Sequence, residues 1–363
     1  MAILGSVWFM EGVSSQKDML ALVKQARAEE GYRFQIIASH RNERPEILAE
    51  ADFCYIEPAD NHALLPFIAK VCNKHNVVAI HAGKRGQLLE TLRTEIEKLG
   101  VKLSTGAVSS ETFELADNKA LFSERMASAG LPALESIVVQ TPEEVAEAIA
   151  HIERQNQRPC IKPVRGIYGM GFWVLARTAE RLSFFNMPDN RQIHPDIALA
   201  SLRSAAEAGQ KLPVQIVMPW LIGPECSVDI LAEQGRVIAA VGRRKNGSVQ
   251  TLENSGPAYQ LALACAETLR VDGLINVQTR NNERGEPVLL EANLRPSGGI
   301  GYTAFSGVNL PGLFALRQLG FISEADTARK TALFQPIKVI PTNNVKPLPV
   351  CTIDKLDDVS TQD

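Results

Sequence analysis

A short stretch near the end of the chain, LLEANLRPSGG at residues 289–299, carries three different polar side chains at alternate positions. In a β-strand, Glu291, Asn293 and Arg295 share one face, because side chains alternate between the two faces. The apolar residues between them predict a core on the other face. Carboxylate and amide oxygens suit a hard cation such as Mg²⁺, and a guanidinium can hold a phosphate oxygen. A solvent-facing polar strand face is the alternative.

The strand before this stretch supplies a further oxygen ligand. GLINVQTR (273–280) is joined to it by the turn NNERGE. If the Arg-Gly pair at 284–285 forms a two-residue loop, Gln278 lies across from Glu291. We therefore predict a metal site made by Gln278, Glu291 and Asn293, with a single charged ligand.

A glycine-rich segment, CIKPVRGIYGMGFWVL (160–175), places Lys162 in a strand and then Gly166, Gly169 and Gly171 in a loop. Glycines let backbone N–H groups approach phosphate closely. The segment is not a Walker P-loop, because no Gly-Lys-Ser/Thr follows and the next element is a strand. The pattern favours a flexible lid over a nucleotide. A hairpin whose glycines serve only its turns is the alternative.

A third segment, QIVMPWLIGPECSVDIL (215–231), offers contacts for a base. The C=O of Pro219 and the N–H of Leu221 form an acceptor–donor pair that adenine can use, and Glu225 can accept from ribose hydroxyls. The alternative is a bent pair of strands with Trp220 in the core.

A basic run, Arg243-Arg244-Lys245, ends the strand VIAAVG. A hairpin from CSVDIL would aim this run at the nucleotide cleft. We predict that Arg243 or Arg244 binds the substrate carboxylate or the phosphates. A solvated strand end is the alternative.

The first hundred residues contain the elements of an open, mostly parallel α/β sheet, because short apolar runs alternate with amphipathic stretches. The runs are 2–9, 34–39, 52–56, 76–82 and 101–105. Ligands bind beyond the carboxyl ends of such strands. The polar residues there are Ser14, Ser15, Gln16, His40, Arg41, His81 and Arg85. The basic ones suggest an anionic ligand, with ordinary polar loops as the alternative. No G-x-G-x-x-G follows the first strand, which disfavours an NAD(P)-linked oxidoreductase.

Beyond residue 110 the pattern changes to two helices and then antiparallel hairpins. The helices are expected at 115–130 and 142–155, with a strand at 131–139 between them, and 177–212 reads as a variable polar stretch. A short strand and a polar tail are expected after residue 336. The expected segments are 1–108, 109–212, 213–335 and 336–363.

The composition of the 363 residues is that of a globular protein, with 45% hydrophobic and 22% charged residues. The net charge of −3 argues against nucleic acid or an anionic membrane as the main partner. The six cysteines are scattered, which predicts neither a disulfide framework nor a zinc site. The N-terminus reads as a strand rather than a signal peptide, and no apolar run is long enough to span a bilayer. We expect a reduced, cytoplasmic location.

The order of these pieces resembles the ATP-grasp superfamily, and most closely its carbamoyl-phosphate-synthase-like and biotin-carboxylase-like members. The resemblance covers about residues 110–320. It implies an N-terminal parallel α/β domain, of the kind called pre-ATP-grasp, followed by a two-lobed ATP-grasp fold with antiparallel sheets. The ordered set of motifs carries the resemblance, because each motif alone is weak.

The resemblance also implies how ATP is held. Lys119 and Lys162 resemble the two lysines that bind the phosphates, and the loop 166–171 resembles the phosphate lid. The adenine and ribose contacts that it implies are Met218, Pro219, Leu221 and Glu225.

The metal ligands that the resemblance implies are Gln278, Glu291 and Asn293, binding one or two Mg²⁺ ions, with Mn²⁺ as an alternative. Many family members have a carboxylate where Gln278 stands, which puts a second metal in doubt. Arg295 resembles the residue that meets the transferred phosphoryl group. With Lys162 and Arg243 it makes up the predicted catalytic set.

The predicted function is therefore an ADP-forming ligase that activates a carboxylate as an acyl phosphate and joins it to an amine. Phosphoryl transfer needs positioning and charge neutralisation, which lysines, Mg²⁺ and an arginine supply. The alternatives are a kinase or carboxylase on the same fold, or a non-catalytic ATP-binding subunit of a biosynthetic complex. Small-molecule substrates are the expected partners, and a homodimer is compatible with the resemblance.

Overall fold

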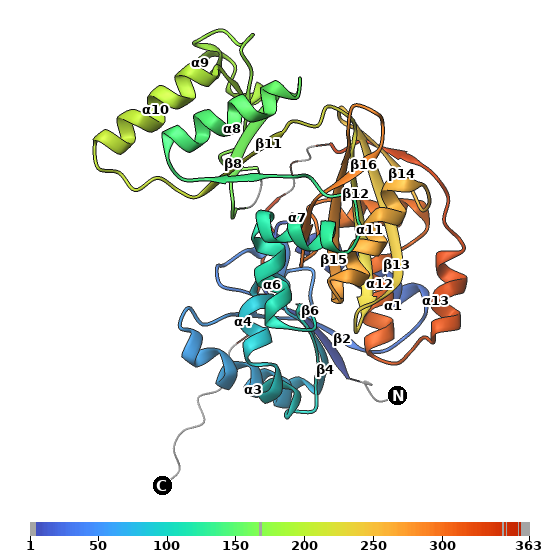
Figure 1. Cartoon of the computed structure of the whole chain (residues 1–363). Coiled ribbons are helices and arrows are strands. Elements are labelled where there is room, and N and C mark those ends of the chain that lie inside the picture. Colours follow the sequence, from blue (N-terminus) through green and yellow to red (C-terminus); the bar gives the residue numbers. More distant parts are fainter. Residues whose placement is uncertain (1–4, 167–168, 343–344, 346, 355, 357–363) are drawn as a thin grey trace. The chain divides into compact units, whose positions relative to one another are not determined.

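The computed structural model describes residues 5–166, 169–342, 345, 347–354 and 356 (Figure 1). The chain forms two compact units. The first contains Met1–Phe113, Glu225–Gln278 and Ala292–Asp363, and the second contains Glu114–Pro224 and Thr279–Glu291. The boundary passes through one helix and two strands, and the four segments expected from the sequence stay predictions.

The first unit begins with the predicted parallel sheet. Its strands are β1 (Ser6–Phe9), β2 (Gln35–His40), β3 (Phe53–Ile56), β4 (Val77–His81) and β5 (Lys102–Ser104). Their order is β3-β2-β1-β4-β5, and every pairing is parallel. All five apolar runs of the sequence therefore became strands of one sheet, which confirms the predicted architecture.

Side-chain alternation along β1 explains how both faces of this sheet are covered. Val7 and Phe9 pack with residues of α1 (Gln16–Glu29), whereas Trp8 and Met10 pack with residues of α3 (Leu64–His75). The remaining helices of this region are α2 (Pro45–Leu48), η1 (Asn61–Ala63), η2 (Gly83–Arg85), α4 (Gly86–Thr91), α5 (Arg93–Glu97) and α6 (Ser110–Asp117).

A larger, mostly antiparallel sheet completes the unit. Its strands are β12 (Glu225–Glu233), β13 (Arg236–Asn246), β14 (Val249–Glu253), β15 (Val271–Asn281), β16 (Pro287–Asn293) and β17 (Lys338–Val339), and β6 (Gly106–Ala107) pairs with β15. The order is β16-β15-β12-β13-β14-β17. Its helices are α11 (Pro257–Thr268), η4 (Ile300–Ser306), α12 (Leu310–Gln318) and α13 (Glu324–Thr331). This region has the hairpins that the sequence predicted.

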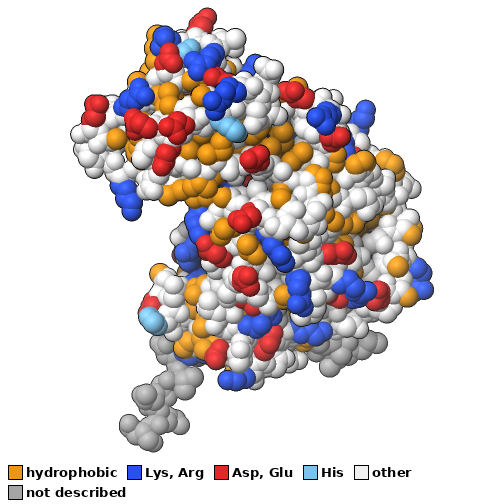
Figure 2. All heavy atoms as spheres, in the orientation of Figure 1, with side chains coloured by type: hydrophobic (Ala, Val, Ile, Leu, Met, Phe, Trp, Pro, Cys, Tyr) orange, Lys and Arg blue, Asp and Glu red, His pale blue; other side chains and the backbone are white. Residues whose placement is uncertain are grey.

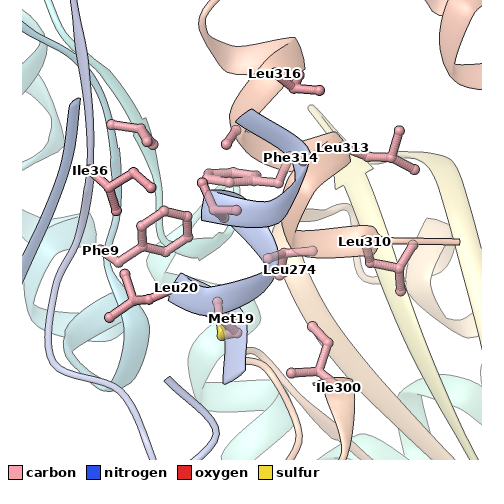
Figure 3. Close-up of a cluster of buried hydrophobic side chains, with 14 of the residues drawn as sticks. Phe9, Met19, Leu20, Ile36, Leu274, Ile300, Leu310, Leu313, Phe314 and Leu316 are labelled. Carbon is pink, nitrogen blue, oxygen red and sulfur yellow. The ribbon is translucent and has the colours of Figure 1, made fainter. Parts of the chain in front are cut away.

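One hydrophobic core joins the two sheets of this unit. Figure 3 shows Phe9 and Leu20 of the N-terminal region beside Phe314 of α12, and the rings of Phe9 and Phe314 are 5.8 Å apart. Asn309 fixes the start of α12: its side chain accepts from the N–H of Gly312 and donates to the carbonyl of Leu22 at 2.8 Å. Asn309 therefore caps the N-terminus of α12.

The second unit is built on a five-stranded sheet. Its strands are β7 (Ile137–Val139), β8 (Pro159–Pro163), β9 (Trp173–Leu175), β10 (Gln192–Ile193) and β11 (Gln215–Pro219), in the order β10-β9-β8-β11-β7. The helices are α7 (Lys119–Ser128), α8 (Pro142–Arg154), α9 (Ser183–Asn186), η3 (Pro188–Asn190) and α10 (Pro195–Glu207). A capping box of Thr141 and Glu144 starts α8 where the sequence predicted.

Three predicted elements differ. The helix expected at 115–130 is two helices, because Asn118 is extended and its side chain accepts from the N–H groups of Ala120 and Leu121. The strand expected at 131–139 is regular only in β7. The polar stretch 177–212 contains α10, which begins at a proline.

Figure 2 shows acidic and basic side chains interspersed over the visible face of the protein. Within the part of the chain that the structure describes, no helix combines the length and apolarity that crossing a bilayer needs.

Candidate active site

In the second unit, one face of the sheet carries candidate nucleotide contacts. Met218 of β11 lies opposite Cys160 of β8, and Lys162 is two positions further along β8, so all three side chains share a face. The residues between them, Ile161 and Val217, pack with α8 on the other face. The candidate residues therefore lie on the face that α8 leaves uncovered.

Lys119, Lys162 and Glu291 form a charged cluster in this unit. Lys119 is buried at the first position of α7, and its ammonium donates to the carbonyl of Gly166 at 3.0 Å. Burial lowers the pKa of Lys162, the Glu291 carboxylate opposes that shift, and the Lys119 charge adds to it. Two lysines and one carboxylate thus share one region, as expected of a site for phosphates and a cation.

The end of β11 has an unusual backbone pairing. Pro219 lies opposite Pro159, and neither residue has an N–H to donate. The Pro219 carbonyl has the Cys160 thiol as a donor at 3.9 Å, a long contact. Met218 and Leu221 are buried in an apolar cluster beside it. An acceptor next to an apolar slot is what the predicted adenine contact requires.

The glycine-rich loop between β8 and β9 is only partly described, because residues 167–168 lie outside the described residues. Gly166, Gly169 and Gly171 have φ of +145°, +63° and +70°, values that side chains rarely adopt. A Cβ at Gly171 would also lie 2.9 Å from the Pro163 ring. The antiparallel pairing of β8 with β9 confirms the predicted hairpin.

The strand that carries Glu291 and Asn293 shows the predicted alternation only in part. Ala292 and Leu294 are buried, whereas Glu291, Asn293 and Arg295 are half-buried. Leu290 differs from Ala292 and Leu294, because it is only half-buried. It packs against the apolar cluster that contains Met218 and Leu221. Arg295, two residues beyond β16, donates to Asn293 Oδ1 at 3.4 Å.

The loop between β15 and β16 is longer than predicted. Asn282 and Glu286 pair across its base, the N–H of Asn282 donating to the Glu286 carbonyl at 2.8 Å, so the loop has three residues. The Asn282 side chain accepts from the N–H groups of Arg284 and Glu286 and fixes this shape. The two-residue loop was wrong, and the position of Gln278 across from Glu291, which rested on it, stays a prediction. The two strands are neighbours in the sheet.

Arg243 lies in a buried network in the first unit, and its side chain is 4% exposed. Its guanidinium donates to Asp229 at 2.7 Å, to Gln250 at 2.8 Å, to Ser227 at 3.0 Å and to Ser297 at 2.7 Å. Asn276 completes the network by donating to Asp229 at 3.1 Å. Sequence reasoning missed Gln250, Asn276 and Ser297, because no spacing along the chain links them to Arg243.

The neighbouring cations are also paired. Arg244 makes a bidentate ion pair with Glu253 at 2.8 and 3.0 Å. Lys245 donates to Glu225 at 2.5 Å, so the carboxylate predicted to contact ribose has a cationic partner. Each member of the basic run therefore has a carboxylate partner, and the contact of Arg243 or Arg244 with substrate or phosphate stays a prediction.

A small pocket of about 10 Å³ in the first unit, room for about one water molecule, is lined by Arg295, Lys84 and Ser15, among apolar residues of β1 and α1. Ser15 is 3% exposed, and its hydroxyl has no hydrogen-bond partner among the residues that the structure describes. A buried hydroxyl without a partner is costly. The lining thus holds the Ser15 hydroxyl, the Arg295 guanidinium and Lys84, whose ammonium also donates to Glu11 at 3.4 Å.

The anionic ligand suggested by His81 and Arg85 is not supported by their surroundings. Arg85 is buried against Glu57 at 3.1 Å and also donates to Asn61. Burial lowers the pKa of His81 to about 4, so its ring is neutral at neutral pH. Arg41 is paired with Glu11.

Among the described residues, no three His, Cys, Asp or Glu side chains cluster as a metal site. The predicted ligand set differs from such a cluster, because it has one carboxylate and two amides.

Comparison with known proteins identifies related sequences. Residues 211–344 match the family model described as "ATP-grasp in the biosynthetic pathway with Ter operon". A curated relative, the carbamoyl phosphate synthase large chain of Pyrococcus furiosus, is 24% identical over 253 residues. The match covers 66% of this chain and 22% of the relative, so the chain spans about a fifth of the curated relative's length.

Solved structures with the same fold cover most of the chain. The ADP complex of N5-carboxyaminoimidazole ribonucleotide synthetase has a TM-score of 0.63 at 18% identity, covering 94% of this chain and 82% of that one. An L-amino acid ligase from Bacillus licheniformis has a TM-score of 0.59 at 14% identity, with coverages of 90% and 77%. The biotin carboxylase domain of a Hydrogenobacter thermophilus 2-oxoglutarate carboxylase has a TM-score of 0.58 at 16% identity, with coverages of 89% and 69%. At these identities the likeness shows the fold.

Proposed function

Because the chain contains an ATP-grasp domain, we propose that it is an ADP-forming ligase that joins a carboxylate to an amine. The carboxylate attacks the γ-phosphorus of ATP, ADP leaves, and the amine then displaces phosphate from the acyl phosphate. The observation that carries this proposal is the electrostatic interaction of Lys162, which shares a face with Met218, with both Lys119 and Glu291. A nucleotide's phosphates and a cation need such a set of charges.

Within this proposal the nucleotide is bound mainly by the second unit. Lys119 and Lys162 neutralise the phosphates, and Pro219 accepts from the adenine amino group at the end of β11. Lys119 suits this role because its ammonium donates to a neutral backbone carbonyl. The glycine loop adds backbone N–H groups to the phosphates.

The donor set of Glu291 and Asn293 fits Mg²⁺, which takes one or two protein oxygens and keeps other positions for phosphate and water. Gln278 is the third proposed ligand. When bound, the cation neutralises charge on the transferred phosphoryl group. Arg295 stabilises the same charge from beyond the end of β16. A single carboxylate in the set favours one tightly held ion.

The pocket beside Arg295 is the proposed site of the carboxylate substrate's reactive end. Arg295 offers positive charge, the charge of Lys84 is partly compensated by Glu11, and the Ser15 hydroxyl gains a hydrogen bond when a carboxylate oxygen enters. Arg243 acts in this proposal by holding Ser297, two residues after Arg295, rather than by touching substrate.

A titration with a non-hydrolysable ATP analogue, with and without Mg²⁺, tests the proposal. Wild type is expected to bind in the micromolar range only with Mg²⁺. Glu291→Ala is expected to lose this Mg²⁺ dependence, because adding Mg²⁺ no longer strengthens its weak binding. Glu283→Ala, an exposed carboxylate in the loop before β16, is the matched control and is expected to bind as wild type does. Failure of wild type to bind would refute the nucleotide site.

ADP release from mixtures of carboxylates and amines then separates the possible reactions. A condensed product supports ligation. A phosphorylated or carboxylated product without condensation would identify a kinase or carboxylase instead. Binding without turnover under every mixture would identify a non-catalytic subunit. We also propose a cytoplasmic location, supported by six free cysteines.

A further inference from the structure

Two cysteines that are 297 positions apart lie in contact in the first unit. The sulfur atoms of Cys54 and Cys351 are 3.1 Å apart. Cys54 lies on β3 and is 5% exposed, whereas Cys351 is half-exposed near the end of the described chain. All six cysteines are free thiols, and no spacing along the chain connects these two.

Contacts other than the sulfur atoms hold the two residues together. The segment 351–354 runs along β3, which is the edge strand of the N-terminal sheet. The N–H of Asp354 donates to the Cys54 carbonyl at 2.8 Å, and the N–H of Cys54 donates to the Asp354 carboxylate at 2.9 Å. Ile353 packs against the hydrophobic core. The backbone therefore positions the thiols, and their proximity does not depend on a bond between them.

We propose that Cys54 and Cys351 form a reversible disulfide that fastens the segment 351–354 to the edge of the N-terminal sheet. Disulfides in reducing compartments are usually transient and redox-sensing. This site is distinct from the proposed ligase chemistry and does not rest on it.

The proposed oxidant is a small-molecule disulfide, and the exchange takes two steps. The Cys351 thiolate attacks one sulfur of the oxidant, forming a mixed disulfide and releasing one thiolate. Cys54 then attacks the Cys351 sulfur, releasing the second thiolate, which takes the Cys54 proton. Overall, two cysteine thiols and one disulfide give one protein disulfide and two small thiols, so atoms and electrons balance.

The order of these steps follows from exposure. Cys351 is the thiol that a small oxidant can reach, whereas Cys54 is buried beneath it. Burial, reinforced by the neighbouring Cys351, raises the pKa of Cys54 to about 12. Cys54 thus stays protonated and acts second, when the mixed disulfide is already beside it.

Incubation of the full-length protein with oxidised glutathione tests the proposal. After acid quenching and alkylation in denaturant, the reduced protein is expected to carry six labels and the oxidised protein four. Peptide mapping is expected to find Cys54 joined to Cys351, dithiothreitol is expected to restore six labels, and the oxidised protein is expected to unfold at higher urea concentration.

Three variants complete the design. Cys54→Ser and Cys351→Ser are expected to abolish the cross-link, with Cys54→Ser retaining glutathione on Cys351. Cys72→Ser, which removes a buried cysteine of α3, is the matched control and is expected to form the cross-link. A stable glutathione adduct on Cys351 in wild type, a cross-link between two chains, or six labels after oxidation would each overturn the proposal.

Discussion

Replacing Arg243 by Met tests whether this arginine is structural or a substrate contact. The change keeps a long apolar side chain but removes the four hydrogen bonds to Asp229, Gln250, Ser227 and Ser297. Asp229 is then left buried, with the Asn276 amide as its remaining described partner. Removing one member of a buried ion pair costs about 3–5 kcal/mol, because the other charge stays desolvated.

The magnitude can be divided by two further variants. Arg243→Lys keeps a positive charge beside Asp229. The compact lysine ammonium cannot donate to as many acceptors at once as the planar guanidinium of arginine does. It loses about two hydrogen bonds from the charged head to neutral acceptors and is expected to destabilise the protein less than Arg243→Met, because Asp229 keeps a cationic partner. Arg243→Met combined with Asp229→Leu removes both charges and is expected to recover much of the lost stability, because no unpaired charge remains.

Urea denaturation followed by tryptophan fluorescence measures these differences in the free energy of unfolding. If Arg243→Met unfolds within about 1 kcal/mol of wild type, the network does not carry the stability that we assign to it. A rise in the apparent KM for a substrate with unchanged stability would restore Arg243 as a direct substrate contact. The exposed Arg284→Met is the matched control, since Arg284 lies at the loop tip.

Two further predictions concern pH. Burial raises the pKa of Asp272 from 3.8 to about 6, so the folded state favours its protonated form, and the stability from this group is present below pH 3.8 and lost as pH rises through 6. Relative to Asp272→Asn, wild type should lose up to about 3 kcal/mol of unfolding free energy over that range, and parallel stability curves for the two proteins would contradict this. Burial lowers the pKa of Lys162, so this lysine loses its positive charge at a lower pH than an ordinary lysine does. Affinity for the ATP analogue should therefore fall as the pH rises through that lowered pKa. Calorimetric titration at several pH values should show this fall in wild type and in the exposed-lysine control Lys211→Met, and an equal fall in Lys162→Met would contradict the assignment.

Elements with strong local signals were predictable from the sequence. Each of the five parallel strands is a short apolar run followed by a polar turn, and burial on both faces explains why such runs are nearly continuous. The helix α8 has a capping box at its start. Local chemistry decides these elements, so a single sequence contains the information.

Other elements depended on contacts that the sequence does not display. The apolar pattern runs through Asn118, yet its side chain caps α7 and divides the helix. The helix α10 is rich in alanine and serine and buries little, so its pattern was weak. The three-residue loop after β15 is set by the Asn282 side chain, which outweighs the local preference for an Arg-Gly turn.

The charged residues show the same limit and how the structure resolves it. Arg85, Arg243 and Arg244 were as plausible for anion binding as the lysines, because sequence shows the charge but not its partner. Each of these arginines has a carboxylate at hydrogen-bond distance that comes from another strand or loop. Lys119 instead donates to a backbone carbonyl, which compensates little of its charge. A cation held by a neutral group keeps its attraction for phosphate. For this reason we propose Lys119 as a phosphate ligand and propose structural roles for the three arginines.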